Sequence, residues 1–261
     1  MFSKKIIYSF LLSLFFLSFS ANSADLNGIL KSGEIKIAVP EAFAPFGSVG
    51  KTGEHEGYDV DVAQLIAKDL GVKLKIVPVV SKQRIPFLET DKVDLVISTM
   101  GANPSRAKSI NFSSAYAPFY SGVFAPSTIK VSSYKDLDGL TIGVTGGTLE
   151  DLELTKMAPK GAKITRFGDN AATLSAIKSK QVQVLVAGNT VAASVTEANP
   201  DFDLERKFII KDSPCFRGVK KGNEDLLRWV NVFILHKKLG GALNKISQKW
   251  LGQDLPALPS L

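Results

Sequence analysis

The sequence predicts an α/β fold built as two units of similar size. Strand-like segments alternate along the chain with segments whose apolar residues recur at helical spacing. This alternation occurs twice, once before and once after the stretch APFYSGVFAPS at 117–127. In each unit a strand delivers the chain into a polar turn that begins a helix. Such alternation is typical of α/β sheets with substantial parallel pairing.

The first unit begins with the strand IKIAV at 35–39. The stretch VDVAQLIAKDL at 60–70 has apolar residues at helical spacing and stops at Gly71, a residue common just past a helix end. The remaining elements are expected as a strand at 74–80, a short helix at 85–89, a strand at 93–98 and a helix that begins at Pro104.

The second unit repeats this order with different lengths. Its strands are expected at 140–145, 163–167 and 182–186, and its helices at 149–158, 171–179 and 190–198. Two further helices, at 224–239 and 243–251, follow it. The stretch IIKDSPCFRGV at 209–219 could return the chain to the first unit.

Arg106 stands in an unusual place in the expected helix after Pro104. Asn103 suits the N-cap and Pro104 the first helical position, which puts Arg106 in the first turn. That end of a helix is already positive, so a cation there is unfavourable unless an anion meets it. The arginine therefore either binds an anionic ligand, pairs with a carboxylate or lies on the surface.

The first 24 residues have the pattern of a secretory signal peptide. Lys4 and Lys5 precede a short apolar run, and small residues at 20–24 lead to an expected cleavage near Ser23 or Ala24. The run is shorter than the ~20 apolar residues that span a bilayer, which argues against the alternative of a membrane anchor. The only cysteine is Cys215, so no lipid is expected on a new N-terminal cysteine.

Composition excludes several classes of function. A single cysteine, Cys215, allows no intrachain disulfide, so a core must provide stability, and this cysteine is expected to be buried. Without Lys4 and Lys5 the chain has 30 basic and 25 acidic residues, scattered rather than in blocks. Nucleic-acid binding is therefore not expected. His55 and His236 lie far apart with no cysteine partner, so neither a metal nor a cofactor is expected.

Five motifs resemble the periplasmic amino-acid-binding proteins of ABC importers, the family 3 solute-binding proteins. They occur in the family's order and cover essentially the whole mature chain. They are GYDVDVAQLIAKDLG at 57–71, RIPFLETDKVDLVISTM at 84–100, SRAKSINFSSAY at 105–116, GLTIGVTGGT at 139–148 and GVKKGNEDLLRWVNVFI at 218–234.

The resemblance implies a two-lobe periplasmic-binding-protein fold of type II. Each lobe would be a mixed, largely parallel sheet flanked by helices, with residues 25–118 and 214–261 in lobe one and 119–213 in lobe two. Two hinge crossings would let the lobes close around a ligand. The implied function is capture of an amino acid or related carboxylate in the periplasm by a monomer, for delivery to a membrane permease. The alternative on the same fold is an enzyme that resembles cyclohexadienyl dehydratase, with Glu150 or Asp151 as the acid.

The resemblance also implies where lobe one meets the ligand. Arg106 would bind the ligand's α-carboxylate through its planar fork, with Arg84 or Thr148 as the next candidates. Ser98, Thr99 and Gly101 match polar residues at the strand end, although relatives often carry Ser or Thr where Gly101 stands.

Aromatic and lobe-two residues complete the implied site. Phe43 and Phe46 match an aromatic wall, with a place in the core as the alternative. Gly147 and Thr148 match a cradle for the carboxylate, with simple helix capping as the alternative. Relatives commonly follow with a second Thr or Ser, and Leu149 departs from that pattern.

A second departure concerns the ligand's ammonium group. Many relatives place an aspartate for it shortly after the lobe-two strand, but the stretch 182–193 offers Gly188 and Asn189. A neutral amide does not offset a desolvated positive charge as a carboxylate does. The ligand would then have a substituted or absent amino group, or Glu150 or Asp151 would hold the ammonium. Alternatively, Asn189 and backbone carbonyls suffice.

Other chemistry-bearing residues have structural explanations. Asp59 and Asp61 fall in the first turn of their helix, where capping and the helix dipole account for them better than catalysis does. Trp229 and Trp250 lie in amphipathic C-terminal helices and are expected in the core.

Overall fold

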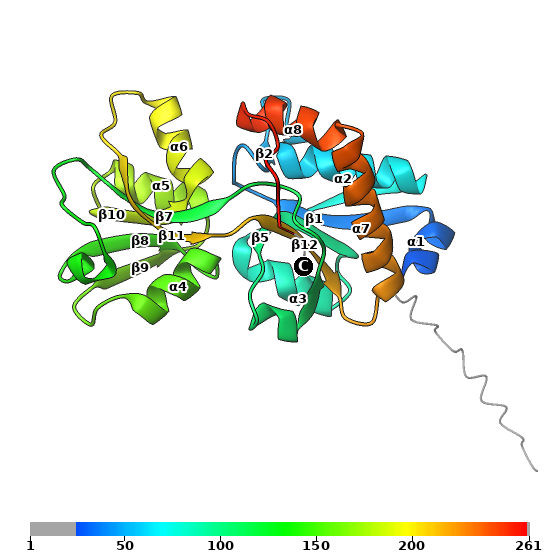
Figure 1. Cartoon of the computed structure of the whole chain (residues 1–261), viewed down its shortest axis with the longest axis horizontal. Coiled ribbons are helices and arrows are strands. Elements are labelled where there is room, and N and C mark those ends of the chain that lie inside the picture. The colour runs from blue at the N-terminus through cyan, green and yellow to red at the C-terminus, as the bar shows by residue number, and fades with distance from the viewer. Residues whose placement is uncertain (1–24, 260–261) are drawn as a thin grey trace, which may run out of the picture.

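The protein has two five-stranded sheets that lie side by side, each covered by helices (Figure 1), in a computed structural model that describes residues 25–259. The predicted signal peptide lies outside these residues. The first sheet has the order β4-β1-β5-β12-β6 and the second β11-β7-β10-β8-β9. We call the part built on the first sheet lobe one and the part built on the second lobe two.

The strands of the first sheet are β1 (Glu34–Pro40), β4 (Lys73–Val79), β5 (Leu95–Gly101), β6 (Ile110–Phe112) and β12 (Cys215–Lys220). Those of the second are β7 (Tyr120–Ala125), β8 (Thr141–Thr145), β9 (Lys163–Phe167), β10 (Val184–Gly188) and β11 (Glu205–Asp212). A small ribbon pairs β2 (Ser48–Val49) with β3 (His55–Glu56).

The predicted mixed pairing is confirmed in both sheets. In the first, β1 pairs in parallel with β4 and β5, while β12 runs antiparallel to β5 and β6. In the second, β8 pairs in parallel with β9 and β10, while β7 runs antiparallel to β10 and β11. The antiparallel pairs involve the strands next to the crossings between the lobes. The alternation of strands and helices in the sequence did not reveal which strands would be antiparallel.

Helices pack on both faces of each sheet (Figure 1). In lobe one they are α1 (Leu26–Ser32), α2 (Tyr58–Leu70), α3 (Arg84–Glu89), α7 (Glu224–Leu239) and α8 (Ala242–Leu251), and in lobe two α4 (Leu149–Met157), α5 (Asn170–Lys178) and α6 (Asn189–Ala198). The predicted helix at 60–70 is confirmed, and Gly71 ends it in the left-handed conformation with φ 69°. No helix within residues 25–259 is long and apolar enough to cross a membrane.

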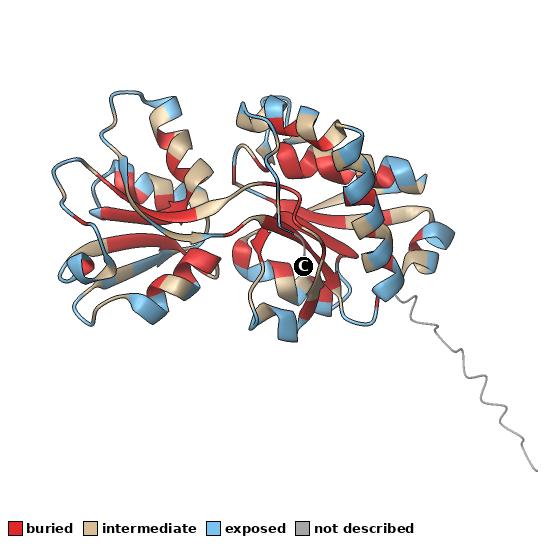
Figure 2. Ribbon diagram, viewed as in Figure 1, coloured by how far each residue is buried: buried red, intermediate tan, exposed pale blue. Residues whose placement is uncertain are grey.

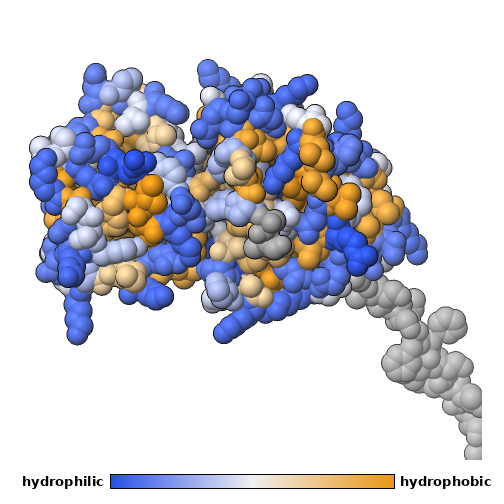
Figure 3. Space-filling view, viewed as in Figure 1, coloured by the Kyte–Doolittle hydropathy of each residue, from blue (hydrophilic) through white to orange (hydrophobic). Residues whose placement is uncertain are grey.

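Both faces of the central strands are buried, as Figure 2 shows for each lobe. In β10, Leu185 and Ala187 pack in the cluster that includes α5 and α6, whereas Val184 and Val186 pack with Leu154 of α4. Because successive side chains of a strand point to opposite faces of the sheet, they pack alternately against the two helical layers. The visible surface is mostly polar, with apolar side chains over both lobes (Figure 3).

The prediction of a helix that begins at Pro104 was wrong. The chain there makes a single 3₁₀ turn, η2 (Arg106–Lys108), before β6 begins at Ile110. Asn103 does cap this turn, because its Oδ1 accepts from the Arg106 backbone N–H at 2.8 Å. The pairing of β6 with β12, more than 100 residues away in sequence, ends the turn early. A helix dipole therefore does not explain Arg106.

The prediction that Asp59 and Asp61 cap their helix was also wrong. Both acids do lie in the first turn of α2. Gly57 occupies the N-cap and no side chain caps there. Asp59 is fully buried and accepts from Thr99 Oγ1 at 2.9 Å and from the Tyr116 hydroxyl at 2.6 Å. Asp61 accepts from Lys249 Nζ at 2.7 Å and Trp250 Nε1 at 2.8 Å, which ties α2 to α8. Trp250 and Trp229 are partly buried against the core.

The two crossings between the lobes run beside each other. The Cys215 N–H donates to the Ala117 carbonyl at 2.9 Å, and the Ser213 N–H donates to the Phe119 carbonyl at 3.0 Å. Cys215 is buried, as predicted, and burial raises its pKa well above the usual range. The hinge is therefore a hydrogen-bonded pair of segments rather than two separate linkers.

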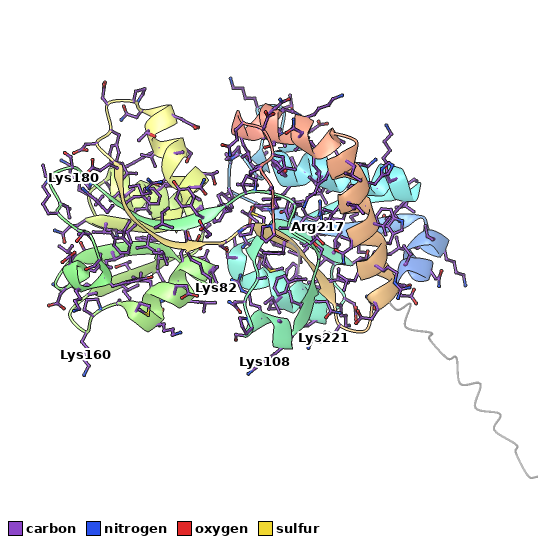
Figure 4. The ribbon with its side chains drawn as sticks, viewed as in Figure 1. Lys82, Lys108, Lys160, Lys180, Arg217 and Lys221 are labelled. Carbon is purple, nitrogen blue, oxygen red and sulfur yellow. The ribbon has the colours of Figure 1, made fainter. Side chains whose placement is uncertain are left out.

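Arg217, in β12, is fully buried in lobe one (Figure 4). Its guanidinium lies 4.2 Å from the Tyr116 ring centroid, and its three nitrogens have no hydrogen-bond partner within residues 25–259. Burial lowers its pKa to about 10. The Arg217 cation therefore packs against the face of the Tyr116 ring, and the hydroxyl of that ring donates to Asp59.

Candidate ligand-binding site

A pocket lies between the two lobes. Lobe one contributes the end of β5 and the side chains of Arg84 and Arg106. Lobe two contributes the start of α4 and the end of β10. Phe119 and Ser213 line it from the two crossings. The pocket thus lies where ligands of open α/β sheets bind, outside the carboxyl ends of parallel strands.

The predicted site residues divide into two groups. Phe43, Thr99, Gly101, Arg106 and Thr148 line this pocket. The other predicted contacts lie beside or behind it, and the following paragraphs place them: Phe46, Ser98, Gly147 and Asn189.

Arg106 holds the two lobes together through backbone carbonyls. Its Nη1 donates to the Gly101 carbonyl at 2.8 Å, and its Nη2 donates to the Gly147 carbonyl at 3.0 Å. Gly147 also packs closely against Lys82, which Figure 4 shows at the border between the lobes. Burial lowers the pKa of Arg106, but nearby Glu150 opposes that effect.

Arg84 is the second cation of the pocket, and it was only a secondary candidate from the sequence. Its side chain is buried at 5% exposure, and its Nε donates to Ser98 Oγ at 3.0 Å. Ser98 therefore orients a pocket residue rather than lining the pocket itself. Burial, reinforced by the neighbouring charge of Arg106, lowers the pKa of Arg84 to about 10.

Thr99 is held in a strained conformation at the end of β5. Its φ is 45°, which costs of order 1–3 kcal/mol for a residue other than glycine. Its hydroxyl donates to Asp59, which the sequence had assigned to helix capping. Burial raises the pKa of Asp59 to about 6, against the hydrogen bonds from Tyr116 and Thr99. Asp59 is therefore a support of the pocket wall.

Aromatic rings form one wall of the pocket. Phe43 lines it and packs 5.4 Å from the fully buried Phe46, measured between ring centroids. Phe119 lies 6.1 Å from both rings and also lines the pocket. The sequence analysis missed Phe119, and its place in the first crossing was the available signal. The expected ligand contact of Phe46 stays a prediction.

The start of α4 forms the polar edge of lobe two. Thr148 caps the helix, which was the alternative considered from the sequence, because its Oγ1 accepts from the Asp151 N–H at 3.2 Å. Its expected contact with a ligand carboxylate stays a prediction. The Asp151 carboxylate accepts from the Gly147 N–H at 2.9 Å and from Arg166 Nε at 2.7 Å. Glu150 instead lines the pocket and accepts from Ser121 Oγ at 2.9 Å.

The end of β10 presents Gly188 to the pocket, and the next residue points elsewhere. Asn189 Oδ1 accepts from the Tyr120 N–H at 3.1 Å, which attaches α6 to the first crossing. A Cβ on Gly188 would lie 1.8 Å from Phe119 Cζ, so the Phe119 ring fills the space beside this glycine. Whether Asn189 contacts a ligand ammonium stays a prediction.

The architecture is that of a two-lobe solute-binding protein. It combines two α/β lobes, two crossings between them and a charged pocket at their interface. The chain matches the model of the bacterial extracellular solute-binding proteins, family 3, over residues 35–253. It belongs to this family, and its fold is the type II periplasmic binding fold.

Relatives in sequence and in structure agree with this assignment. The chain is 29% identical over 207 residues to the ABC transporter glutamine-binding protein GlnH of Bacillus subtilis, covering 78% of this chain and 75% of GlnH. A crystal structure of a mutant of ArgBP from T. maritima superposes with a TM-score of 0.81 at 29% identity, covering 87% of this chain and 99% of that one. The ancestral amino acid-binding protein AncCDT-1, a precursor of cyclohexadienyl dehydratase, gives 0.80 at 30% identity, covering 86% and 98%.

Proposed function

We propose that this protein captures an amino acid or a closely related carboxylate outside the cytoplasm for uptake by an ABC transporter. The observation that carries the proposal is the guanidinium of Arg106, which lies in the pocket between the lobes and contacts both of them. A planar guanidinium suits a carboxylate because the two can pair through parallel hydrogen bonds. Family membership and the glutamine-binding name of GlnH support the same class of solute.

Location and partners extend this proposal. The predicted signal peptide and the extracellular family favour export to the periplasm, with the permease of an ABC importer as the membrane partner. We propose a monomer whose lobe boundaries fall at 118/119 and 213/214, next to the hydrogen-bonded crossings. Closure would then bend the chain at these two points.

Binding, not catalysis, is the activity that the comparisons support. Each of the three relatives is named as a binding protein, including the precursor of the dehydratase. Asp151, one of the two acids considered for an enzyme, is occupied by the Gly147 N–H and Arg166. We conclude that the chain is not an enzyme and that Glu150 shapes the pocket for a solute.

A thermal-shift screen of the purified mature protein tests the proposed function. Amino acids, opine-like conjugates and small carboxylates form the panel. A ligand at 100 times its Kd adds about 2.7 kcal/mol to the free energy of unfolding, which raises the melting temperature measurably. Arg106→Ala should strongly reduce the shift. Absence of a shift with every amino-acid-like compound would reject the proposed function.

A further inference from the structure

Two guanidinium groups face the pocket without a close acidic partner. Arg84 and Arg106 both line it, and within residues 25–259 neither nitrogen fork has a carboxylate oxygen within 4.0 Å. The Nε of Arg84 is taken by Ser98, and Nη1 and Nη2 of Arg106 donate to carbonyls. Buried charges are normally paired, so these two groups favour an anionic partner from outside the chain.

Glu150 is the single acidic side chain among the residues that line this pocket in the described chain. It lies near enough to Arg84 and Arg106 to favour their charged forms. Two cations and one anion leave the pocket walls with a net charge of +1. A zwitterionic amino acid brings no net charge and leaves this excess uncompensated, whereas a monoanion offsets it.

Two acids near the pocket are already engaged by other groups of the protein. Asp151 is bound to the Gly147 N–H and Arg166, and Asp59 lies behind Thr99 with Tyr116. The space beside Gly188, where the family resemblance would place an acid, holds the Phe119 ring. Glu150 accepts from Ser121 Oγ, and an ammonium placed beside it would be repelled by the nearby charges of Arg84 and Arg106.

Apolar side chains also line the pocket, next to polar ones. The apolar residues are Phe43, Phe119, Val186, Ala187 and Val191, and the Phe119 ring lies beside Gly188. An uncharged substituent can be buried against such a surface at little cost, whereas a charged ammonium there would lose its hydration without compensation.

We propose that the solute is an anion without a free α-ammonium group: an N-acylated amino acid or the corresponding 2-oxo acid. This rests on the proposed function and deepens it. The carboxylate lies between Arg84 and Arg106, and the neutral acylamino or oxo end lies toward Phe119 and Gly188. Glu150 then does not receive a cation from the solute.

Isothermal titration and thermal shifts with matched compounds test the proposal on the full mature chain. The panel contains the standard amino acids, the N-acetyl derivative of each and the 2-oxo acid of each. The tightest binder should be a derivative, and it should bind at least tenfold more tightly than its parent amino acid. A free amino acid as tightest binder would overturn this inference and leave the proposed function standing. No response from any compound would reject both.

Variants of the charged residues provide a second test with the best compound. Arg84→Gln should weaken its binding at least tenfold, whereas Lys108→Gln, an exposed change near Arg106, serves as the matched control. Glu150→Gln should strengthen binding at least threefold, because it removes a negative charge that faces the anion. Weaker binding by Glu150→Gln would place a cationic group of the solute on Glu150 and overturn the proposal. Melting without ligand verifies that each variant is folded.

Discussion

The guanidinium of Arg106 joins the two lobes: its Nη2 donates to the Gly147 carbonyl at 3.0 Å, and its Nη1 donates to the Gly101 carbonyl at 2.8 Å. Gly101 ends a strand of lobe one, and Gly147 lies in the turn before α4 of lobe two. The side chain assigned to the ligand's carboxylate is therefore oriented by the closed arrangement itself. Closing the two lobes therefore also places the Arg106 guanidinium for binding an anion.

Arg106→Ala should leave the fold intact and weaken solute binding by roughly 2 to 5 kcal/mol. This is the range for removing one partner of a buried, hydrogen-bonded charge pair. Isothermal titration with the best compound of the screen measures the loss, and the exposed Lys108→Ala is the control. A change below threefold would move the carboxylate contact to Arg84 or Thr148.

Ligand should reduce the radius of gyration without changing the secondary structure. The reason is that the described contacts between Lys82 and the Gly147 turn, and between Arg106 and Gly147, exist only when the lobes are together. Small-angle scattering and circular dichroism, with and without saturating ligand, measure the two quantities. Identical scattering profiles would indicate a cleft that is permanently closed.

Asp59 should make the folded protein less stable as the pH rises from about 4 to about 6. Its pKa in the folded protein is about 6, raised by burial from 3.8. Between these values the folded state holds more protons than the unfolded state, so the free energy of unfolding falls with pH. Above about 6 this contribution is constant.

Urea denaturation of the parent and of Asp59→Asn between pH 4 and pH 7 isolates this effect. The stability of the parent relative to the variant should decrease across the window and then level off. A constant difference would mean that Asp59 does not titrate there. The neutral amide also loses one of the two hydrogen bonds from Thr99 and Tyr116, which lowers stability at every pH.

Gly188→Ala should destabilise the protein by about 1–3 kcal/mol, the usual range for overpacking a core. The added Cβ would lie 1.8 Å from Phe119 Cζ, so the ring must move. A double-mutant cycle with Phe119→Ala, measured by urea denaturation, should be strongly non-additive because the smaller residue removes the clash. Additive effects would show that the two positions do not compete for the same space.

The order of elements could be read from the sequence because it depends on local patterns. Helical spacing at 60–70 and the glycine at 71 located α2, and the motif around Arg106 located a pocket residue. The short turn after Pro104 could not be predicted, because the pairing of β6 with a distant strand ends it. Local rules misassigned Asp59 for the same reason, since Tyr116 lies 57 residues away. Phe119 lies in a crossing, and only the assembled fold brings it beside Gly188.

The paired crossings make the hinge part of the binding surface. Phe119 and Ser213 are joined by a backbone hydrogen bond, and both line the pocket. A solute that fills the pocket therefore contacts the paired crossings, which must bend when the lobes open and close. The stiffness of the crossings thus contributes to the binding affinity. Loosening them would raise the rates of capture and escape together. How long the solute is retained thus depends on the flexibility of the crossings as well as on the groups that contact the solute.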